Sequence, residues 1–372
     1  MITIKEVTTK RLSKKFTNFP IKLFKNIDAF VPALSLDEEN VFSKKKNPVH
    51  EYCDSIRFLA YKDRKIVGRI AGIINHKYNE AYHKKIVRFT RIDMIDDIEV
   101  TKTLINQVIE WGKQYGATEI IGPIGFTDLD RQGMLVEGFD EFGSFITIWN
   151  PKYYHEHLEK LGFIKDVDWI ESQIEWPNEV PDKIKLGTEI VKKRFKYELV
   201  KIKRKKDLSK YVYDAFDVYN RAFNVLYGFY PLSRKVMDYY IKQVKLIVNL
   251  DFLWFVRDEN QKVIALGVMM PSLAMANKKN HGKLLPFGFI RILKSLKKFD
   301  VVDFYFIAVD PEHQGRGVFS LIIEDGIRQG IKYGVRMAET GPELENNKKI
   351  LAQWKDFNPK YHKRRRCYKM DI

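Results

Sequence analysis

Residues 309–318, with the sequence VDPEHQGRGV, combine two closely spaced glycines with an arginine, and they stand between a strand-like run and a helical run. Glycine accepts backbone conformations that other residues avoid, so Gly315 and Gly317 allow a tight turn whose N–H groups converge. The helix that follows adds the positive end of its dipole. We therefore predict a cradle for a diphosphate, with Arg316 as an additional positive contact. The alternative is that the glycines only form a turn.

The elements around this segment predict a sheet covered by helices. Two β-rich runs separated by a short polar turn predict a hairpin, and the helix after the glycines carries apolar residues at every fourth position. In chain order the expected elements are the strands 252–257 and 263–270, the strand 304–309, the helix 317–333 and the short strand 335–338.

The same order occurs in the first half of the chain, with a hairpin over 57–74, a strand over 86–92, a helix around 104–112 and a short strand over 119–122. Two copies predict duplicated α/β domains, each a mixed, mostly antiparallel sheet flanked by helices. Prolines at 177 and 181, followed by a basic stretch, indicate the boundary. We predict the domains 1–190 and 191–372.

Residues 309–318 resemble the acetyl-CoA loop of the GNAT (GCN5-related N-acetyltransferase) superfamily. In that loop Gln or Arg is followed by two residues, Gly, one residue, and Gly or Ala; Gln314 and Gly317 match, whereas Phe319 replaces the small residue. The whole chain resembles an uncharacterised bacterial group of tandem GNAT proteins. That resemblance is carried by Asn18-Phe19-Pro20, Gly122-Pro123, residues 133–140, residues 149–154, and residues 339–347 with Glu345-Asn346-Asn347.

The resemblance implies acetyl-CoA or a longer acyl-CoA as co-substrate, bound by the second domain, and no metal. In the first domain Asp96 and Asp97 stand where the phosphate cradle would be and would repel it, so we expect no CoA there. The family also implies that a backbone N–H at the end of the fourth strand polarises the thioester carbonyl. The expected contacts are Ile307, Ala308, Val309, Gln314, Gly315, Arg316, Gly317 and Val318.

Acyl transfer from a thioester to an amine needs a base for the amine and an acid for the departing thiolate. Glu339 follows a predicted strand, where a carboxylate faces the crevice at the strand ends, and is our first choice as base. Glu345 is the second choice; the alternative for both is a solvated surface carboxylate. Tyr368 is the candidate acid or a packing residue. Tandem relatives imply the α-carboxylate of Ile372 as another base.

The acceptor lies between the domains in tandem relatives such as N-myristoyltransferase. This geometry suggests Glu137, Asp140, Asn150 and Tyr153 as acceptor contacts, although Tyr153 is alternatively an ordinary core aromatic. Asn347 either orients the acceptor or caps the helix that follows it.

The net charge of +17 fits a nucleic acid, an anionic membrane surface or CoA as partner. Ser272–Phe299 holds seven Lys or Arg and no acid, interleaved with apolar residues, and predicts a basic amphipathic insertion on an anionic membrane. The alternative is a helix that bridges the acceptor cleft. No nucleic-acid-binding motif is present, and we do not expect that partner. Two distant cysteines indicate neither a zinc site nor a disulfide framework. We expect a cytoplasmic protein, with the inner membrane face as its peripheral location.

These observations together predict an acyl-CoA-dependent N-acyltransferase. It would transfer an acetyl or longer acyl group to an amine, a small molecule or a lipid, bound between the domains, by direct attack on the thioester. One alternative is a peripheral-membrane enzyme that N-acylates a lipid base with a long chain, as in ceramide-type synthesis. An alternative of another class is a nucleic-acid-binding or non-catalytic GNAT-like protein.

Overall fold

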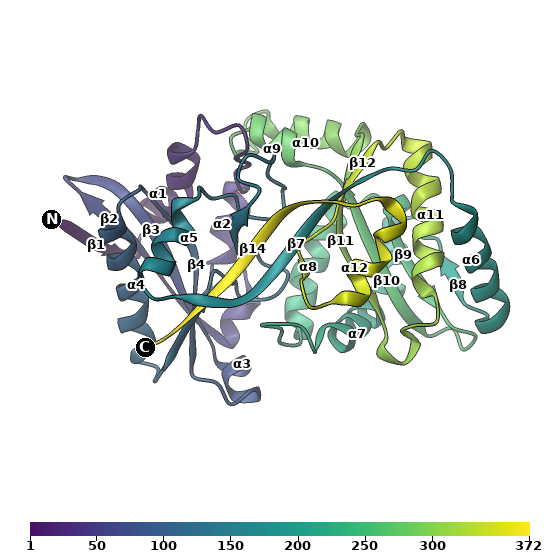
Figure 1. The fold of residues 1–372 in the computed structure, drawn as a ribbon, viewed down its shortest axis with the longest axis horizontal. Helices are drawn as coiled ribbons and strands as arrows, with labels where there is room; N and C mark the ends of the chain where they lie inside the picture. The colour runs from purple at the N-terminus through teal and green to yellow at the C-terminus, as the bar shows by residue number, and fades with distance from the viewer.

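One continuous mixed sheet runs along the longest axis of the molecule (Figure 1). The computed structural model describes residues 1–372. The strands of the first half are β1 (Ile2–Glu6), β2 (Cys53–Lys62), β3 (Lys65–Asn75), β4 (Ile86–Met94), β5 (Glu119–Gly122), β6 (Met134–Glu137) and β7 (Ile164–Glu175). Those of the second half are β8 (Glu198–Val200), β9 (Leu253–Arg257), β10 (Val263–Pro271), β11 (Val301–Val309), β12 (Met337–Glu339), β13 (Glu343–Leu344) and β14 (Lys360–Asp371).

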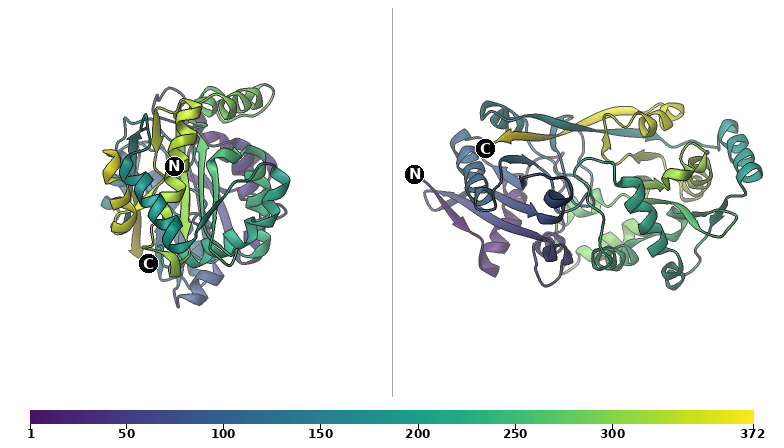
Figure 2. Two further views of the ribbon diagram at one scale, coloured as in Figure 1. Left: turned by 90° about the vertical axis from the view of Figure 1, so that its right-hand side faces the viewer. Right: turned by 90° about the horizontal axis from the view of Figure 1, so that it is seen from below.

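Helices lie on both faces of this sheet (Figure 2). In the first half they are α1 (Lys10–Leu23), α2 (Ser35–Val41), α3 (His76–Ala81), α4 (Ile98–Lys113), α5 (Tyr153–Lys160) and α6 (Asp182–Phe195). In the second half they are α7 (Val212–Phe223), α8 (Arg234–Ile247), α9 (Ala274–Lys279), α10 (Gly288–Lys297), α11 (Val318–Tyr333) and α12 (Lys348–Gln353). Short 3₁₀ turns occupy Pro48–Glu51, Lys205–Lys210, Leu250–Phe252, Pro311–His313 and Lys355–Phe357.

The two predicted hairpins and the two predicted long helices are present. β2 and β3 pair antiparallel from Lys62 opposite Lys65, and β9 and β10 pair in the same way. Alternation along β10 explains how both faces are covered. Leu266, Val268 and Met270 belong to the core that α7 joins, whereas Ala265 and Met269 belong to the core beneath α11.

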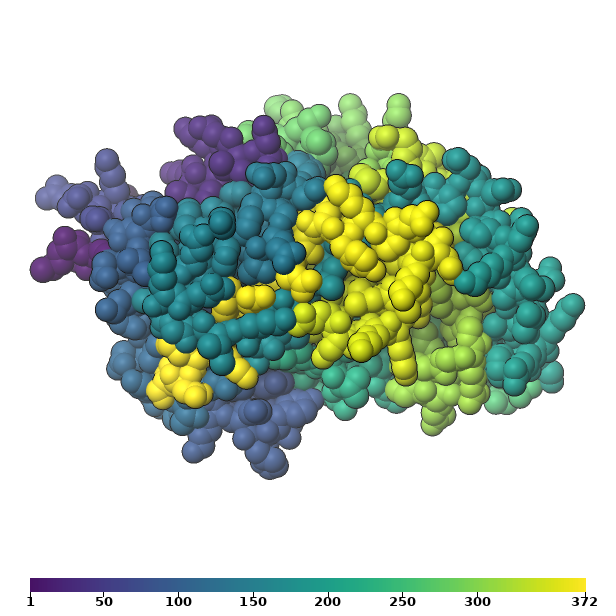
Figure 3. Space-filling model, in the orientation of Figure 1, coloured from purple at the N-terminus to yellow at the C-terminus, as the bar shows by residue number.

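The two halves share their central strands, and no sequence signal predicted this. The order across the sheet is β1-β2-β3-β4-β5-β14-β7-β12-β11-β10-β9-β8. β14, from the end of the chain, therefore pairs with β5 of the first half, while β7 of the first half pairs with β12 of the second. In the space-filling view the yellow carboxy-terminal segment is visible across the middle of the face and again at lower left (Figure 3). The division into 1–190 and 191–372 stays a prediction.

Candidate active site

The loop between β11 and α11 is held in place by hydrogen bonds to side chains of other elements. Arg221 donates to Oδ2 of the buried Asp310, with its Nη2 at 2.6 Å, and Oδ1 of Asp310 accepts from the amide of Glu312. The ring of His313 lies 2.6 Å from the Tyr197 hydroxyl. These contacts fix the start of the loop, so the glycine turn beyond it has a defined position.

The glycine turn presents several amides that have no partner. Gly315 and Gly317 adopt left-handed conformations with φ of 75° and 76°, which glycine accepts without strain. The amides from Gly315 to Val318 donate no hydrogen bond within the chain. A Cβ on Gly315 would meet nothing within 4 Å, whereas one on Gly317 would lie 2.6 Å from a methyl of Val191. The turn therefore has the free donors and the open space that an anionic group requires.

Phe319 does not fill this turn. Its ring packs edge-on against Trp354, with 5.6 Å between the centroids, and belongs to the core beneath α11. The Gln314 side chain turns back, and its Nε2 donates to the carbonyl of Val309 at 3.2 Å. Arg316 is exposed beside the turn, with its guanidinium 5.8 Å from the Phe195 ring centroid. The departure from the family pattern at Phe319 therefore leaves the turn open.

β11 and β12 pair in parallel only from Val301 to Asp303, although β11 continues to Val309. The register between β10 and β11 shifts so that Tyr305 has no partner on β10. This bulge lies upstream of Ile307–Val309, the stretch for which a carbonyl-polarising amide was predicted. Asp303 and Glu339 mark the point at which pairing between the two strands ends.

Glu339 is part of a hydrogen-bonded chain that crosses to the first half of the molecule. It accepts from Gln173 Nε2 at 2.8 Å, and its Oε2 lies 2.9 Å from Nε2 of His362. The other ring nitrogen of His362 lies 3.2 Å from Glu141 Oε2. The His362 side chain is fully buried between these two carboxylates. Glu339 is thus held in place by β7 and β14, which the sequence did not place beside it.

More buried charged residues surround these hydrogen-bonded side chains of Glu339, His362 and Glu141. Lys363 Nζ lies 3.3 Å from Glu171 and 3.6 Å from Glu339, and Arg365 also pairs with Glu171. Arg365 donates to the Thr147 hydroxyl as well. Burial alone would raise the pKa of Glu171, but the two cations outweigh it and hold that pKa below its ordinary value. We call Glu141, Glu171, Asp303, Glu339, His362, Lys363 and Arg365 the junction cluster.

Asp303 is the member of the junction cluster that lacks a hydrogen-bond partner. It is 2% exposed, and neither of its carboxylate oxygens accepts a hydrogen bond. Burial, and after it the neighbouring charge of Glu339, raises the pKa of Asp303 to about 7. A carboxyl group that titrates near neutral pH suits proton transfer. The sequence analysis missed Asp303 and His362; an acid inside the apolar run VVDFYF was the available signal for Asp303.

Other predicted site residues serve the structure. Tyr368 was predicted as an acid beside the CoA thiol, but it packs in the core of the first half and donates to Glu159 at 2.8 Å. The amide of Ile372 donates to the Thr118 carbonyl nearby, so the chain end also lies in the first half. Both positions follow from the crossing of β14 to β5, and the contacts of Tyr368 favour the packing role that was its alternative; the acid and base roles stay predictions. Glu345 joins a surface ion network with Lys165 at 2.6 Å.

The predicted acceptor contacts are mostly engaged elsewhere. Asn150 is buried and bonds both backbone groups of Leu135, at 2.7 and 3.0 Å. Tyr153 donates to the Met94 carbonyl at 2.7 Å. Asn347 caps α12, as the alternative proposed. Glu137 is exposed and pairs with Arg364, and Asp140 is exposed in a turn after β6. The structure does not bring these residues together into one site.

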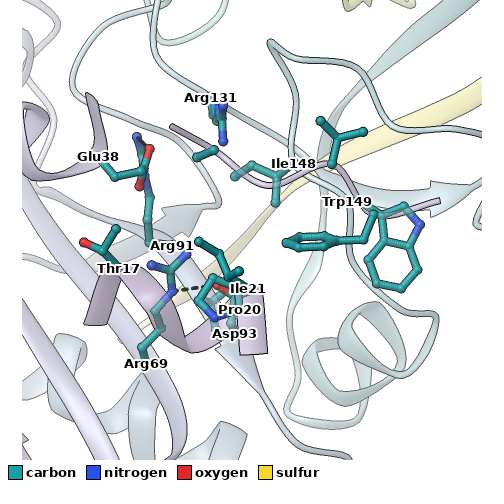
Figure 4. A pocket seen from close by; sticks show the side chains of 14 residues that line it. Thr17, Pro20, Ile21, Glu38, Arg69, Arg91, Asp93, Arg131, Ile148 and Trp149 are labelled. Carbon is teal, nitrogen blue, oxygen red and sulfur yellow. Dashed lines mark hydrogen bonds and ion pairs between the residues drawn. The ribbon is translucent and has the colours of Figure 1, made fainter. Parts of the chain in front are cut away.

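A cavity in the first half contains charged residues that the sequence analysis did not select (Figure 4). The volume that the centre of a water-sized sphere can reach in it is about 40 Å³, and part of the hollow is open to solvent. Arg91 is clamped between Glu38 and Asp130, at 3.1 and 2.6 Å. Arg131 donates to the Phe145 carbonyl at 2.9 Å and forms no ion pair. The lining residues are Thr17, Pro20, Ile21, Phe30, Val31, Ala33, Glu38, Arg69, Arg91, Ile92, Asp93, Arg131, Ile148 and Trp149.

The cavity and the junction cluster both contact one segment, residues 145–148. Arg131 of the cavity donates to the carbonyl of Phe145, while Arg365 of the junction cluster donates to that of Ile148. Ile148 itself lines the cavity.

In the first half the amino terminus of α4 is capped by Asp97, whose carboxylate accepts from the Glu99 amide. That helix end is therefore already occupied by the protein's own anion.

Comparison with known proteins identifies the architecture. No protein-family model matches the chain. Protein YghO of Escherichia coli strain K12 is 27% identical over 286 residues, which cover 76% of this chain and 72% of that protein. A protein of Caulobacter vibrioides named bacterial ceramide synthase is 24% identical over 302 residues, covering 80% and 77%. The solved tandem GNAT protein from the clavulanic acid biosynthesis pathway, without AcCoA, matches with a TM-score of 0.58 at 10% identity, covering 100% of this chain and 98% of that one.

The chain has the tandem GNAT fold.

The tandem GNAT fold confirms the predicted fold class, two α/β units with mixed sheets flanked by helices. No group of three or more His, Cys, Asp or Glu side chains is arranged to hold a metal ion. None of the helices is long and apolar enough to span a membrane.

Proposed function

We propose that this tandem GNAT protein is an acyl-CoA-dependent N-acyltransferase. The observation that carries the proposal is the glycine turn of residues 314–318. It has unpartnered amides at the start of α11, left-handed glycines and open space at Gly315. A diphosphate would accept hydrogen bonds from these amides and interact favourably with the helix dipole.

The acyl group would lie near the junction cluster. Six residues separate Val309 from Asp303 along β11, a distance of about 20 Å at roughly 3.3 Å per residue. The extended pantetheine arm of CoA covers a distance of this order. A diphosphate at the glycine turn would therefore place the thioester near the point at which β11 and β12 stop pairing. Glu339 and Asp303 flank this point and are our candidates for proton transfer.

The reaction would proceed by direct attack. The amine nitrogen forms a C–N bond to the thioester carbonyl carbon, the C–S bond breaks, and the thiolate leaves and takes up a proton. A neighbouring carboxylate removes the proton that the amine loses. Glu339 suits this base role because His362 fixes its orientation, and Asp303 is able to carry a proton near pH 7.

The cavity in the first half is our candidate for the part of the acceptor remote from the amine. One side is apolar, with Phe30, Ile148 and Trp149, and another presents the guanidinium of Arg131, which has no carboxylate partner. An acceptor with an apolar body and a polar or anionic group would match both sides. Its amine would lie at the junction cluster, which residues 145–148 connect to the cavity through the hydrogen bonds of Arg131 and Arg365.

A second candidate function is long-chain N-acylation of a lipid base. The resemblance to the protein named bacterial ceramide synthase, at 24% identity over 302 residues, favours it. So does the exposed apolar surface of α10, which a soluble small-molecule enzyme does not need. A non-catalytic or nucleic-acid-binding GNAT-like protein remains the alternative of another class, and an assay for turnover separates it from both.

Turnover is tested with the purified full-length chain, acetyl-CoA or palmitoyl-CoA, and separate amines: a long-chain amino alcohol, a polyamine and an amino acid. Release of free CoA thiol and formation of the amide, identified by mass spectrometry, are followed together. We expect amide formation that Glu339→Gln slows by roughly 100-fold or more. A preference for palmitoyl-CoA with the amino alcohol would select the lipid reaction. CoA binding without any amide product would contradict the enzymatic proposal.

A further inference from the structure

The hairpin of α9 and α10 exposes a cluster of large apolar side chains. Leu285, Phe287 and Leu293 are 76%, 68% and 52% exposed, and Phe289 and Ile290 are exposed as well. These five residues lie within nine consecutive positions. Ile292 lies on the buried side of α10 and packs against Leu273 and Ala276. The apolar stripe of α10 is therefore wider than the part that the protein covers.

The hairpin is docked firmly on the first half of the molecule. The amide of Ser35 donates to the Gly282 carbonyl at 2.8 Å, and Lys278 contacts the carbonyl of Ile27 at 3.1 Å. A Cβ on Gly282 would lie 2.4 Å from the Ala33 carbonyl oxygen. These contacts use α9 and the turn that follows it. They leave the outer face of α10 uncovered.

Cations border the exposed apolar stripe. Along the helix Phe289 and Leu293 are four residues apart and share a face, and Lys297 continues it by one more turn. Arg291, Lys294 and Lys298 occupy the adjoining face and are exposed. Residues 272–299 contain seven Lys or Arg and no acid. An apolar stripe next to a basic face suits the boundary between acyl chains and anionic headgroups.

We propose that the outer face of α10 docks the protein on an anionic lipid surface, with Phe287, Phe289 and Leu293 in the apolar boundary and Lys294, Lys297 and Lys298 at the headgroups. The absence of acidic side chains from the hairpin favours lipid over a second copy of this chain, because two such basic faces would repel each other. The inference does not depend on acyl transfer.

The test is flotation of the full-length protein with vesicles of phosphatidylcholine alone or with about one third phosphatidylglycerol. The α10 charge variant is Lys294→Glu, Lys297→Glu, Lys298→Glu. Its matched control is Lys77→Glu, Lys84→Glu, Lys85→Glu, which changes the same charge at exposed positions in and after α3. An apolar variant replaces Phe287, Phe289 and Leu293 with serine.

We expect binding to the anionic vesicles only, roughly 100-fold weaker for the α10 charge variant and much less affected in the α3 control. The apolar variant should also bind at least about tenfold more weakly. Equal binding by the two charge variants, or no binding of the wild type, would overturn the proposal. So would a wild-type dimer that the apolar variant abolishes, because it would assign the face to self-association. Circular dichroism of each variant shows that a loss of binding is not a loss of folding.

Discussion

Asp303 and Glu339 stand directly opposite each other in the parallel pairing of β11 and β12, so their carboxylates share one face of the sheet. Glu339 is hydrogen-bonded on β7 and β14, whereas Asp303 has no hydrogen-bond partner. Two neighbouring carboxylates in different surroundings titrate differently, and such pairs supply the acid and the base of many active sites.

Asp303→Asn should change the pH dependence of stability. The folded protein raises the pKa of Asp303 from 3.8 to about 7, so it binds this proton more tightly than the unfolded chain does. This tighter proton binding by Asp303 stabilises the folded protein fully below pH 4, and the stabilisation is lost as the pH rises to about 7. Asparagine does not titrate. The variant should therefore gain about 2–4 kcal/mol over wild type between pH 4 and pH 8, measured by urea unfolding.

Burial also raises the pKa of Glu343 to about 7. Glu343 is present in both the wild type and the variant, so its effect on stability cancels when the two are compared. A difference in stability that stays constant with pH would show that Asp303 does not titrate in this range.

Glu339→Gln should lower kcat by roughly 100-fold or more, because it removes the base while keeping the size of the side chain. The KM for acyl-CoA should change little, since the glycine turn is remote from Glu339 along β11. Glu345→Gln is the matched control, because that carboxylate joins a surface ion network and should change kcat by less than about threefold. Steady-state kinetics of the two variants decide; equal losses would remove Glu339 from its role.

Gly315→Ala should weaken CoA binding at least about tenfold, because its Cβ would occupy the open space before the amides. Gly334→Ala is the control at the other end of α11, with φ of 72° against 75° and likewise no atom within 4 Å of a Cβ. Both variants should lose about 1–2 kcal/mol of stability through the left-handed conformation. Calorimetry should find unchanged affinity for Gly334→Ala. Similar affinities for both variants would mean that the glycine turn does not bind the diphosphate.

Tyr368→Phe should leave kcat within about twofold of wild type, because this hydroxyl lies in the core of the first half. It should lower the free energy of unfolding by about 0.5–1.5 kcal/mol through loss of the hydrogen bond to Glu159. Thermal unfolding and kinetics measure the two effects. A large loss of kcat at full stability would restore Tyr368 as a catalytic acid.

Residues 1–190 expressed alone should fold poorly, because β5 and β7 would lose β14 between them and expose unpaired backbone groups. We expect aggregation or non-cooperative thermal unfolding, corrected by a synthetic peptide of residues 358–372. A monomer that unfolds cooperatively without the peptide would show that β14 is dispensable for the first half.

Local patterns predicted the local structure well, whereas the composition of the site depended on contacts between distant segments. The helix predicted around residues 104–112 is α4, and Gly315 and Gly317 predicted the turn before α11. These signals lie within one element. The surroundings of Tyr368 were not predicted, because β14 pairs with β5, more than 240 positions away in the chain.

His362 and Asp303 were missed for the same reason. The chemistry of His362 comes from Glu141 and Glu339, on two other segments, and the raised pKa of Asp303 comes from burial at a junction that no periodicity reveals. Arg91 carried a usable signal, since a charge in the buried run IVRFTRIDM requires a partner. The identity of that partner, Glu38 or Asp130, was not readable from the sequence.

Calorimetric titration of the wild-type protein tests the central claim most directly, with acetyl-CoA, palmitoyl-CoA, free CoA and an S-acyl pantetheine that lacks the diphosphate. If the amides of Gly315 to Val318 hold the diphosphate, the CoA compounds should bind in the micromolar range and the pantetheine thioester roughly 100-fold more weakly. Equal affinities for the CoA and pantetheine thioesters, or no binding of any CoA compound at millimolar concentration, would contradict the account.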